Sequence, residues 1–269
     1  MTETIVRIAT RGDGVTESGR HIPFTAPGDL VRPDGTVEPG PHRADPPCRH
    51  FPECGGCQLQ HVDDEAFAGF LVDRIASALA AQGVPVPEIL PPHISPSVSR
   101  RRASFRAESR GRQVLLGFNA EKSNRIIDMR ECFILRPELF ALVEPLRRLL
   151  GELLGPRGSG GVRMTLSDQG ADILLENVLV EGLHATEALT EFAQAHGVAR
   201  LAIDDGNGPQ TRWEPEPVTI RLGGVPVPLP HGAFLQATEQ GEAALVQAVR
   251  EAAGPARIVA DLFAGLGTF

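Results

Sequence analysis

All four cysteines of the chain lie in its first half, and three of them share one short segment. Cys48, Cys54 and Cys57 stand in CRHFPECGGCQLQH with the spacing C-x5-C-x2-C, and Cys132 follows in RECFIL. The Gly-Gly pair between the second and third cysteines lets the backbone curl, so that their sulfur atoms converge. The pattern predicts a site built from four thiolates, which holds either zinc or an iron–sulfur cluster.

The spacing favours one of these two occupants. Structural zinc sites usually present their cysteines as two pairs, and the second pair is missing here. An iron–sulfur cluster held by all four cysteines therefore fits better. Four unrelated core cysteines are the alternative without a metal.

The N-terminus and the hydropathy indicate where such thiols would be found. The opening residues, MTETIVRIATRGDG, lack the basic patch and apolar core of a secretory signal. No apolar run reaches the roughly 18 residues that a membrane-spanning helix needs. We therefore expect a cytoplasmic protein without membrane contact, whose cysteines stay reduced.

The charge is unevenly distributed along the chain. The net charge is −8, but the window 99–125 holds eight basic residues against Glu108 and Glu121, so it carries +6 and the remainder −14. The basic residues are Arg100, Arg101, Arg102, Arg106, Arg110, Arg112, Lys122 and Arg125. A local basic stripe on an acidic chain suits a specific anionic ligand such as RNA, although a solvated strand face would look the same.

Turn signals and hydrophobic periodicity divide the chain into regions. Residues 1–45 alternate short apolar stretches with glycine-containing turns, which predicts a small β-barrel, and the Pro-rich segment 38–47 reads as a linker. Helices are expected at about 64–82, 137–154, 186–196 and 238–253. Strands are expected at 103–108, 113–118, 125–128, 162–166, 171–175, 199–203, 218–222 and 257–262, the last of them buried. The early part is α+β, and the end alternates strand and helix as an α/β domain does.

Five motifs, taken in order, resemble a known family. The cysteine segment resembles the cluster-binding signature of bacterial 23S rRNA uracil-5-methyltransferases. The others are RRRASFRAE, similar to that family's arginine-containing strand; GFNAEKSNRIIDMRECFIL, similar to the segment that ends in its fourth cysteine; HGAFLQAT, similar to its Phe-x-Gln motif; and DLFAGLGTF, similar to its first cofactor motif. The related bacterial tRNA enzymes generally lack these cysteines, so the resemblance favours an rRNA substrate.

The resemblance implies an α+β multidomain architecture. Residues 1–45 would form a short TRAM-like, OB-like β-barrel, although this region is short for five strands. Residues 46–62 and 95–232 would form a central α/β domain that carries the Fe–S cluster and contacts RNA. Residues 63–94 and 233–269 would belong to a Rossmann-like class I methyltransferase domain.

The resemblance also assigns ligands. Cys48, Cys54, Cys57 and Cys132 would hold a [4Fe–4S] cluster, and Gln236, Phe263 and Thr268 would contact S-adenosylmethionine. The partner would be 23S rRNA, bound by a monomer. Considered alone, the small residues after the expected last strand are compatible with cofactor binding or with a plain turn, and Gln236 is equally a neighbour of a helix start.

The chemistry that the resemblance implies is covalent. Carbon 5 of uracil is a poor nucleophile, so a cysteine thiolate first adds to C6 of a flipped-out base, and a carboxylate later removes the C5 proton. All four cysteines are assigned to the cluster, and the family places the nucleophile and the base after the first cofactor motif. We therefore expect no catalytic residue within 1–269, and a C-terminally truncated chain that is inactive by itself.

Two functions from other classes remain open. A non-catalytic RNA-binding protein with an Fe–S or zinc site would show the same cysteines and basic stripe. A redox protein would explain the cysteines but neither FLQAT nor the final motif. Among single residues, we expect His231 to be a loop residue, Asp204 and Asp205 to form a turn, and Glu239 and Glu242 to serve the first turn of a helix. Trp213 is expected either in the core or stacked on RNA.

Overall fold

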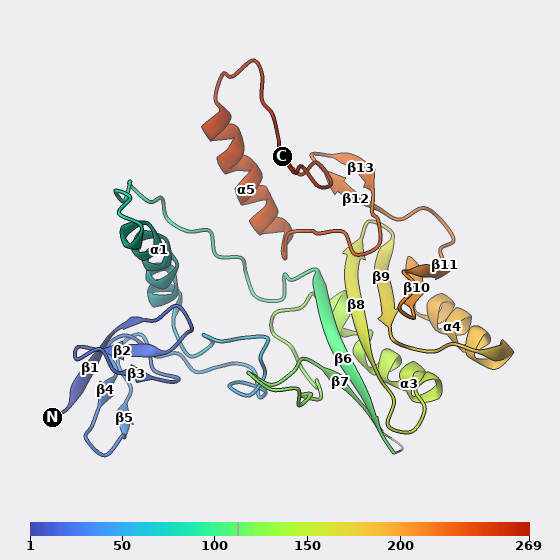
Figure 1. Cartoon of the computed structure of the whole chain (residues 1–269), viewed down its shortest axis with the longest axis horizontal. Coiled ribbons are helices and arrows are strands. Elements are labelled where there is room, and N and C mark those ends of the chain that lie inside the picture. The colour runs from blue at the N-terminus through green and yellow to red at the C-terminus, as the bar shows by residue number, and fades with distance from the viewer. Residues whose placement is uncertain (112) are drawn as a thin grey trace. The chain divides into compact units, whose positions relative to one another are not determined.

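The computed structural model describes residues 1–111 and 113–269 and divides into two compact units, Met1–Ile94 and Ser95–Phe269. Each unit has its own sheet and its own core (Figure 1). Arg112, one member of the basic window, lies outside the described residues. Within the described part of the chain, no helix combines the length and the apolar character needed to cross a membrane.

The first unit contains a five-stranded antiparallel sheet in the order β3-β2-β1-β4-β5. Its strands are β1 (Glu3–Ile8), β2 (Gly14–Thr16), β3 (His21–Ile22), β4 (Leu30–Val31) and β5 (Val37–Glu38). Gly19 and Gly35, with φ of 87° and 86°, adopt the left-handed backbone that its tight turns require. The region before Cys48 is thus long enough for five strands, because four of them need only two or three residues.

A buried carboxylate joins two segments that flank strands β4 and β5. Asp29 is fully buried; one carboxylate oxygen accepts hydrogen bonds from the Ala26 amide (2.7 Å) and from Arg43 Nη2 (2.6 Å), and the other accepts from the Gly40 amide (2.8 Å). A buried charge is tolerated only when it is paired and hydrogen-bonded in this way. Asp29 therefore ties the turn before β4 to the chain that follows β5.

The first helix, α1 (Asp64–Ala81), confirms the helix expected at 64–82. Asp63 caps its start, as an N-cap aspartate should, and Gly83 follows its end with a φ of 67°. Its one buried side chain, Phe70, packs with residues of the first unit, namely Ile8, Ala26 and Val62. Farther along the helix, Ile75 is 52% exposed.

The second unit is built on a six-stranded sheet in the order β11-β10-β9-β8-β6-β7 (Figure 1). Its strands are β6 (Arg102–Arg110), β7 (Gln113–Gly117), β8 (Ser159–Ser167), β9 (Gly170–Glu176), β10 (Arg200–Asp204) and β11 (Gln210–Trp213). Strands β9 and β10 pair in parallel, joined by α4 (Gly182–Ala195), and the other pairs are antiparallel. A separate hairpin, β12 (Thr219–Leu222) with β13 (Val225–Pro228), follows. The strands expected at 162–166, 171–175, 199–203 and 218–222 are confirmed, and the helix expected at 186–196 begins four residues earlier.

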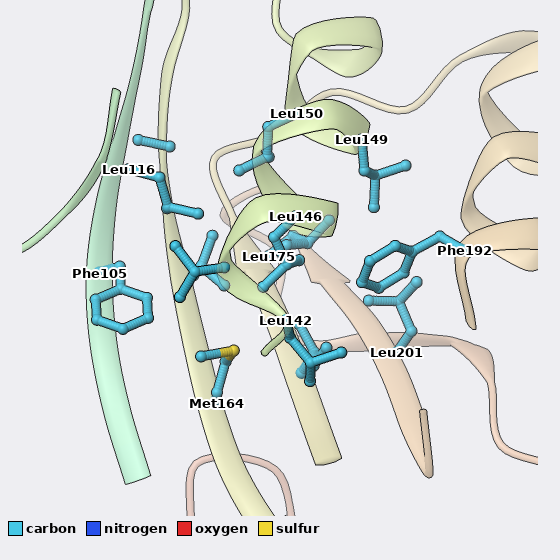
Figure 2. Packing of buried hydrophobic residues seen from close by; sticks show 14 of the residues in the cluster. Phe105, Leu116, Leu142, Leu146, Leu149, Leu150, Met164, Leu175, Phe192 and Leu201 are labelled. Carbon is cyan, nitrogen blue, oxygen red and sulfur yellow. The ribbon is translucent and has the colours of Figure 1, made fainter. Parts of the chain in front are cut away.

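The core of the second unit lies between the sheet and the helices α3 (Val143–Leu153) and α4 (Figure 2). Leu146 and Leu150 of α3 belong to the same cluster as Phe105 and Met164 of the sheet, and all four side chains are at most 1% exposed. In Figure 2, Leu150 points toward Leu116 of β7. Because successive strand residues face opposite sides, burial of this face leaves the intervening residues of β6 on the other face of the sheet. That second face carries the candidate site.

Three expectations about these elements were wrong. The helix expected at 137–154 is two helices, α2 (Pro137–Phe140) and α3, because Pro145 has no amide to bond back across the junction and restricts the residue before it. Residues 125–128 form only an isolated bridge between Ile126 and Asn119. The Asp128 carboxylate accepts from the Leu116 amide (3.2 Å), in place of the main-chain carbonyl that would continue a ladder.

The third error concerns the end of the chain. Helix α5 (Glu239–Ala253) is confirmed, and Thr238 caps it by accepting a hydrogen bond from the Gly241 amide (3.0 Å). Residues 257–262, however, are not a strand, and Ile258 and Leu262 are 91% and 79% exposed. A strand exists only through hydrogen bonds to a neighbouring strand, and none of the described strands pairs with this segment.

Candidate functional site

The HGAFLQAT motif lies in the segment that connects the β12–β13 hairpin to α5. We call residues 229–238 the Gln236 loop. Leu229 and Leu235 of this loop are buried in a small cluster beneath the hairpin, and Thr238 at its end begins α5. Gln236 itself is half-buried between these two fixed points. The predicted cofactor-side glutamine therefore stands on a loop that is anchored at both ends.

Arg101 reaches this loop from the residue before β6. Its side chain is only 2% exposed, its Nε donates to the Gln236 carbonyl (3.2 Å), and its amide donates to the Ala237 carbonyl (2.9 Å). Its Nη2 also pairs with the buried carboxylate of Glu242 in α5. Arg101 was expected in a basic stripe that meets an anionic ligand; that placement was wrong, because its charge is buried and neutralised within the chain.

The next arginine lies beside the aromatic residue of the motif. The guanidinium carbon of Arg102 is 4.6 Å from the centroid of the Phe234 ring, and Phe234 is 67% exposed. Burial, followed by the neighbouring charges of Arg100 and Arg101, lowers the pKa of Arg102. An arginine stacked on an exposed ring offers a flat surface with a positive charge, which suits a nucleic acid base.

Three arginines share the sheet face opposite the core. We call Arg102, Arg106 and Arg163 the arginine face; in β6, Arg102 and Arg106 alternate with the buried Ala103 and Phe105. On β8, Arg163 is 51% exposed along its side chain and pairs with Glu176 (2.6 Å). A Cβ atom placed on Gly232 would lie 3.8 Å from Arg163 Nη1, so the Gln236 loop runs next to this face.

Two further basic residues of the window form ion pairs with acidic residues that lie close to them in the sequence. Arg110 pairs with Glu108 (2.8 Å), and Lys122 pairs with Glu121 (3.1 Å). Arg163, by contrast, lies outside the window, so counting charge along the sequence could not find it. The sequence signal that could have found the arginine face is the alternation of side chains along a strand. It places Arg102 and Arg106 on one face of β6 and separates them from the odd-numbered Arg101.

The final motif approaches the Gln236 loop through one side chain. Leu266 packs against the same cluster that holds Leu235. Phe263, with a φ of 65°, is fully exposed, and Thr268 is half-buried. The structure thus brings the DLFAGLGTF segment and the Gln236 loop onto one cluster, although about 30 residues separate them in the sequence.

The first three cysteines lie in a loop of successive turns, which we call the cysteine loop (residues 48–57). The Phe51 amide donates to the Cys48 carbonyl (3.1 Å), and the Cys57 amide donates to the Cys54 carbonyl (3.4 Å). All three cysteines are half-buried. The Phe51 ring stacks on His61 with 5.5 Å between centroids, so the loop packs against the residues that follow it. Burial lowers the pKa of His61.

Cys132 belongs to the second unit, where it packs, half-buried, against the main core. Across residues 1–111 and 113–269, no three His, Cys, Asp or Glu side chains lie close enough together to hold a metal ion. The structure therefore shows the loop on which a thiolate site would be built, and not the site itself.

Several single-residue expectations can now be checked. His231 is a loop residue, as expected, with its Nε2 3.0 Å from Thr211 Oγ1; burial, then the charge of Arg200, lowers its pKa. Asp204 forms the expected turn by accepting from the Gly206 amide (2.9 Å). Trp213 packs on the core and donates from its indole nitrogen to the Val198 carbonyl (2.9 Å), which favours the core role over RNA stacking.

Comparison with known proteins places the chain in a family. No model of a protein family matches it. It is 49% identical over 265 residues to an uncharacterized RNA methyltransferase of Zymomonas mobilis, covering 98% of this chain and 67% of that protein. It is 38% identical to an uncharacterized RNA methyltransferase of Brucella suis, covering 99% and 66%. The chain thus spans about two thirds of the length of these relatives, and it belongs to their family of bacterial RNA methyltransferases.

Two further matches concern uracil. The 23S rRNA (uracil(1939)-C(5))-methyltransferase RlmD of Halomonas elongata is 34% identical over 248 residues, covering 84% of this chain and 50% of that protein. The crystal structure of Pyrococcus abyssi tRNA (uracil-54, C5)-methyltransferase in complex with S-adenosyl-L-homocysteine matches with a TM-score of 0.63 at 19% identity, covering 93% and 65%. The second match shows a shared fold. The Zymomonas relative confirms the resemblance at the level of the RNA methyltransferase family.

Proposed function

We propose that this protein methylates RNA, transferring a methyl group from S-adenosylmethionine to C5 of a uridine in 23S rRNA. The observation that carries the proposal is the similarity, over 84% of the chain, to a protein named as a 23S rRNA uracil-C5 methyltransferase. The shared fold with a tRNA uracil-C5 methyltransferase supports the same base and position. We further propose that the protein acts as a monomer in the cytoplasm.

In the proposed chemistry, the cofactor supplies the methyl group and the protein binds and orients it. S-adenosylmethionine supplies an electrophilic methyl group, and Gln236, Phe263 and Thr268 are its proposed contacts. Phe263 and Thr268 lie in the segment whose Leu266 shares a cluster with the Gln236 loop, which is consistent with one binding region. We assign neither the thiolate that adds to C6 of uracil nor the base that removes the C5 proton to a residue within 1–269.

The domain assignments are also proposals. We propose that residues 1–45 are a TRAM-like module, that 46–62 and 95–232 form the central domain, and that 63–94 and 233–269 belong to the methyltransferase domain. The five-stranded sheet before the cysteine loop supports the first boundary. Helix α1 packs through Phe70 on the first unit, so the assignment of 63–94 to the methyltransferase domain rests on the resemblance alone.

The four cysteines fit a [4Fe–4S] cluster by donor chemistry. Such clusters are held by four cysteine thiolates, and each of these cysteine residues is half-buried. The turns of the cysteine loop, with a Gly-Gly pair, give a backbone that can close around a cluster. We propose that Cys48, Cys54, Cys57 and Cys132 hold the cluster, and that zinc is the competing occupant.

The arginine face is the proposed contact for the RNA backbone. Replacing Arg106 and Arg163 together by alanine should weaken binding of a single-stranded RNA and reduce the slope of log K against log salt by about 0.7 for each lost phosphate contact. The measurement is fluorescence anisotropy over a salt series. The matched control is Arg148→Ala, which removes an exposed arginine from helix α3 on the opposite side of the sheet. Equal slopes for the double variant and the wild type would mean that Arg106 and Arg163 contact no phosphate and belong to a solvated strand face.

The reaction itself is tested in the cell. Deleting the gene that encodes this chain should remove one 5-methyluridine from 23S rRNA and leave tRNA 5-methyluridine unchanged, as measured by mass spectrometry of nuclease digests. A plasmid copy of the gene should restore the modification, and a copy with Gln236→Ala should restore much less of it. An unchanged 23S rRNA would overturn the proposal, and loss from tRNA alone would correct the substrate.

The same experiment decides the alternative function. A non-catalytic RNA-binding protein would share the arginine face and the cysteine loop, and the deletion would leave all RNA methylation intact. The Gln236 loop favours the methyltransferase, because its backbone is immobilised by a buried arginine, and plain electrostatic binding of RNA needs no such arrangement.

A further inference from the structure

Arg101 is a buried charged group that the proposed chemistry does not use. It has the largest side chain among the fully buried residues of the chain, and its partner Glu242 is 9% exposed. Burying an ion pair costs free energy that a pair of apolar residues would not, so this pair is poorly explained by stability alone. The contacts of Arg101 indicate another role.

The main chain of Arg101 is hydrogen-bonded to the sheet of the second unit. Its carbonyl accepts a hydrogen bond from the Leu166 amide of β8 (2.8 Å), which fixes the backbone from which the side chain extends. The preceding residue, Arg100, donates its amide to the Ile134 carbonyl and accepts from the Arg136 amide, both at 2.9 Å. The main chain that carries the guanidinium is therefore held by hydrogen bonds on both residues.

Arg101 contacts two successive residues of the Gln236 loop, one through its side chain and one through its main-chain amide, and its side chain also contacts the helix that follows. Its Nε and its amide satisfy the carbonyls of Gln236 and Ala237, while Nη2 pairs with Glu242 in the first turn of α5. A planar guanidinium can bind a carbonyl and a carboxylate in fixed directions at once, and a lysine ammonium cannot. The orientation of the Gln236 backbone is thus set by Arg101.

The start of α5 adds a second set of contacts. Thr238 Oγ1 lies 2.7 Å from Ser95 Oγ and accepts from the Gly241 amide (3.0 Å). A side chain at Gly241 would clash with Thr238, since its Cβ would lie 2.8 Å from Oγ1. These contacts fix where the helix begins, and the buried Leu235 fixes the loop on the other side, so that the Arg101 side chain contacts the residues between these two points.

We propose that Arg101, clamped by Glu242, is a positioning residue that holds the Gln236 loop in the orientation in which the Gln236 side chain meets its ligand. The role of Gln236 rests on the proposed function. The position of the loop does not, because it is a property of the protein without RNA or cofactor. The two claims can therefore fail separately.

Hydrogen exchange of the full chain, read by mass spectrometry, tests the clamp without any ligand. Arg101→Met should speed exchange of the amides in 235–242 by about tenfold or more, and Arg101→Lys should do so too, while peptides from α3 and β9 keep their protection. Glu242→Gln keeps an acceptor oxygen and should give a smaller increase. Unchanged exchange of 235–242 in Arg101→Lys and Arg101→Met would overturn the proposal.

The matched control is a second buried arginine of the same unit. Arg200 forms two hydrogen bonds with Asp172, both 2.8 Å, and is 5% exposed. Arg200→Met breaks a buried pair of the same kind without touching the Gln236 carbonyl. It should leave exchange of 235–242 near the wild-type rate, and an equal increase there would show that general loosening of the unit explains the effect of Arg101.

A thermodynamic cycle tests the link to Gln236. With a short uridine-containing RNA as the probe, Arg101→Lys and Gln236→Ala should weaken binding by similar factors, and the double variant should be no weaker than the worse single variant. Additive losses would overturn the positioning role, because they would mean that the two residues act independently. If the chain binds no RNA, the proposed function fails and the exchange experiment alone decides about the clamp.

Discussion

Replacing Cys57 by serine is expected to remove the iron from this protein. Isolated without oxygen, the wild-type chain should contain about four iron atoms and absorb visible light, because a [4Fe–4S] cluster is held by four cysteine thiolates. A serine hydroxyl is a poor substitute for one of them, so Cys57→Ser should lose most of the iron and sulfide. Metal analysis and visible absorbance of the two proteins measure the difference.

The outcomes decide between iron and zinc and test whether Cys57 is a ligand. Zinc in place of iron in the wild-type protein would make the site a zinc site. Full iron content in Cys57→Ser would remove Cys57 from the ligand set. Ser18→Ala, which alters an exposed hydrogen-bonding side chain away from the cysteine loop, is the control and should keep the wild-type iron content.

Replacing Asp29 by alanine is expected to be the most damaging single change to the first unit. The substitution leaves the buried amide of Ala26 and the part-buried amide of Gly40 without acceptors, and Arg43 without its carboxylate. Removing one partner of a buried ion pair costs about 3 kcal/mol or more, which is a large part of the stability of so small a unit. Strands β1 and β4 should therefore lose their protection against hydrogen exchange.

Asp34→Ala is the matched control for this change. Asp34 also accepts a hydrogen bond from a backbone amide, that of Thr36 (2.9 Å), but in an exposed turn where water can replace the carboxylate. Its loss should change exchange of the first unit far less. Comparable effects of the two substitutions would show that the burial of Asp29 contributes little.

The elements predicted most accurately from the sequence are those that local contacts define. Helix α1 begins after Asp63 and ends before Gly83, and helix α5 begins after Thr238, because a capping side chain and a glycine act within a few residues of the helix end. Strands β8 and β9 likewise show their apolar pattern locally. These boundaries needed no information from distant parts of the chain.

The two errors about strands arose because a strand depends on a partner elsewhere in the chain, whereas the helix expected at 137–154 is divided locally at Pro145. The apolar run 257–262 has the composition of a strand, yet no described strand pairs with it and its side chains are exposed. Residues 125–128 run beside β7, but the Asp128 side chain takes a hydrogen bond that a strand would have made. A strand is defined by its partner, and the partner is not encoded in the strand's own residues.

The candidate site also has features that the sequence predicts and features that depend on tertiary contacts. Motif order was sufficient to identify the family, and it also predicts the cysteine loop and Gln236 as site residues, because each motif is contiguous. The sequence also indicated that residues near 100–110 are unusually basic. Only the tertiary structure decided what each arginine does: Arg106 and Arg163 come from different strands to one exposed face, whereas Arg101 is buried against Glu242, 141 residues away. The charge of an arginine is fixed by its chemistry, but whether water or a carboxylate surrounds it depends on which elements pack around it.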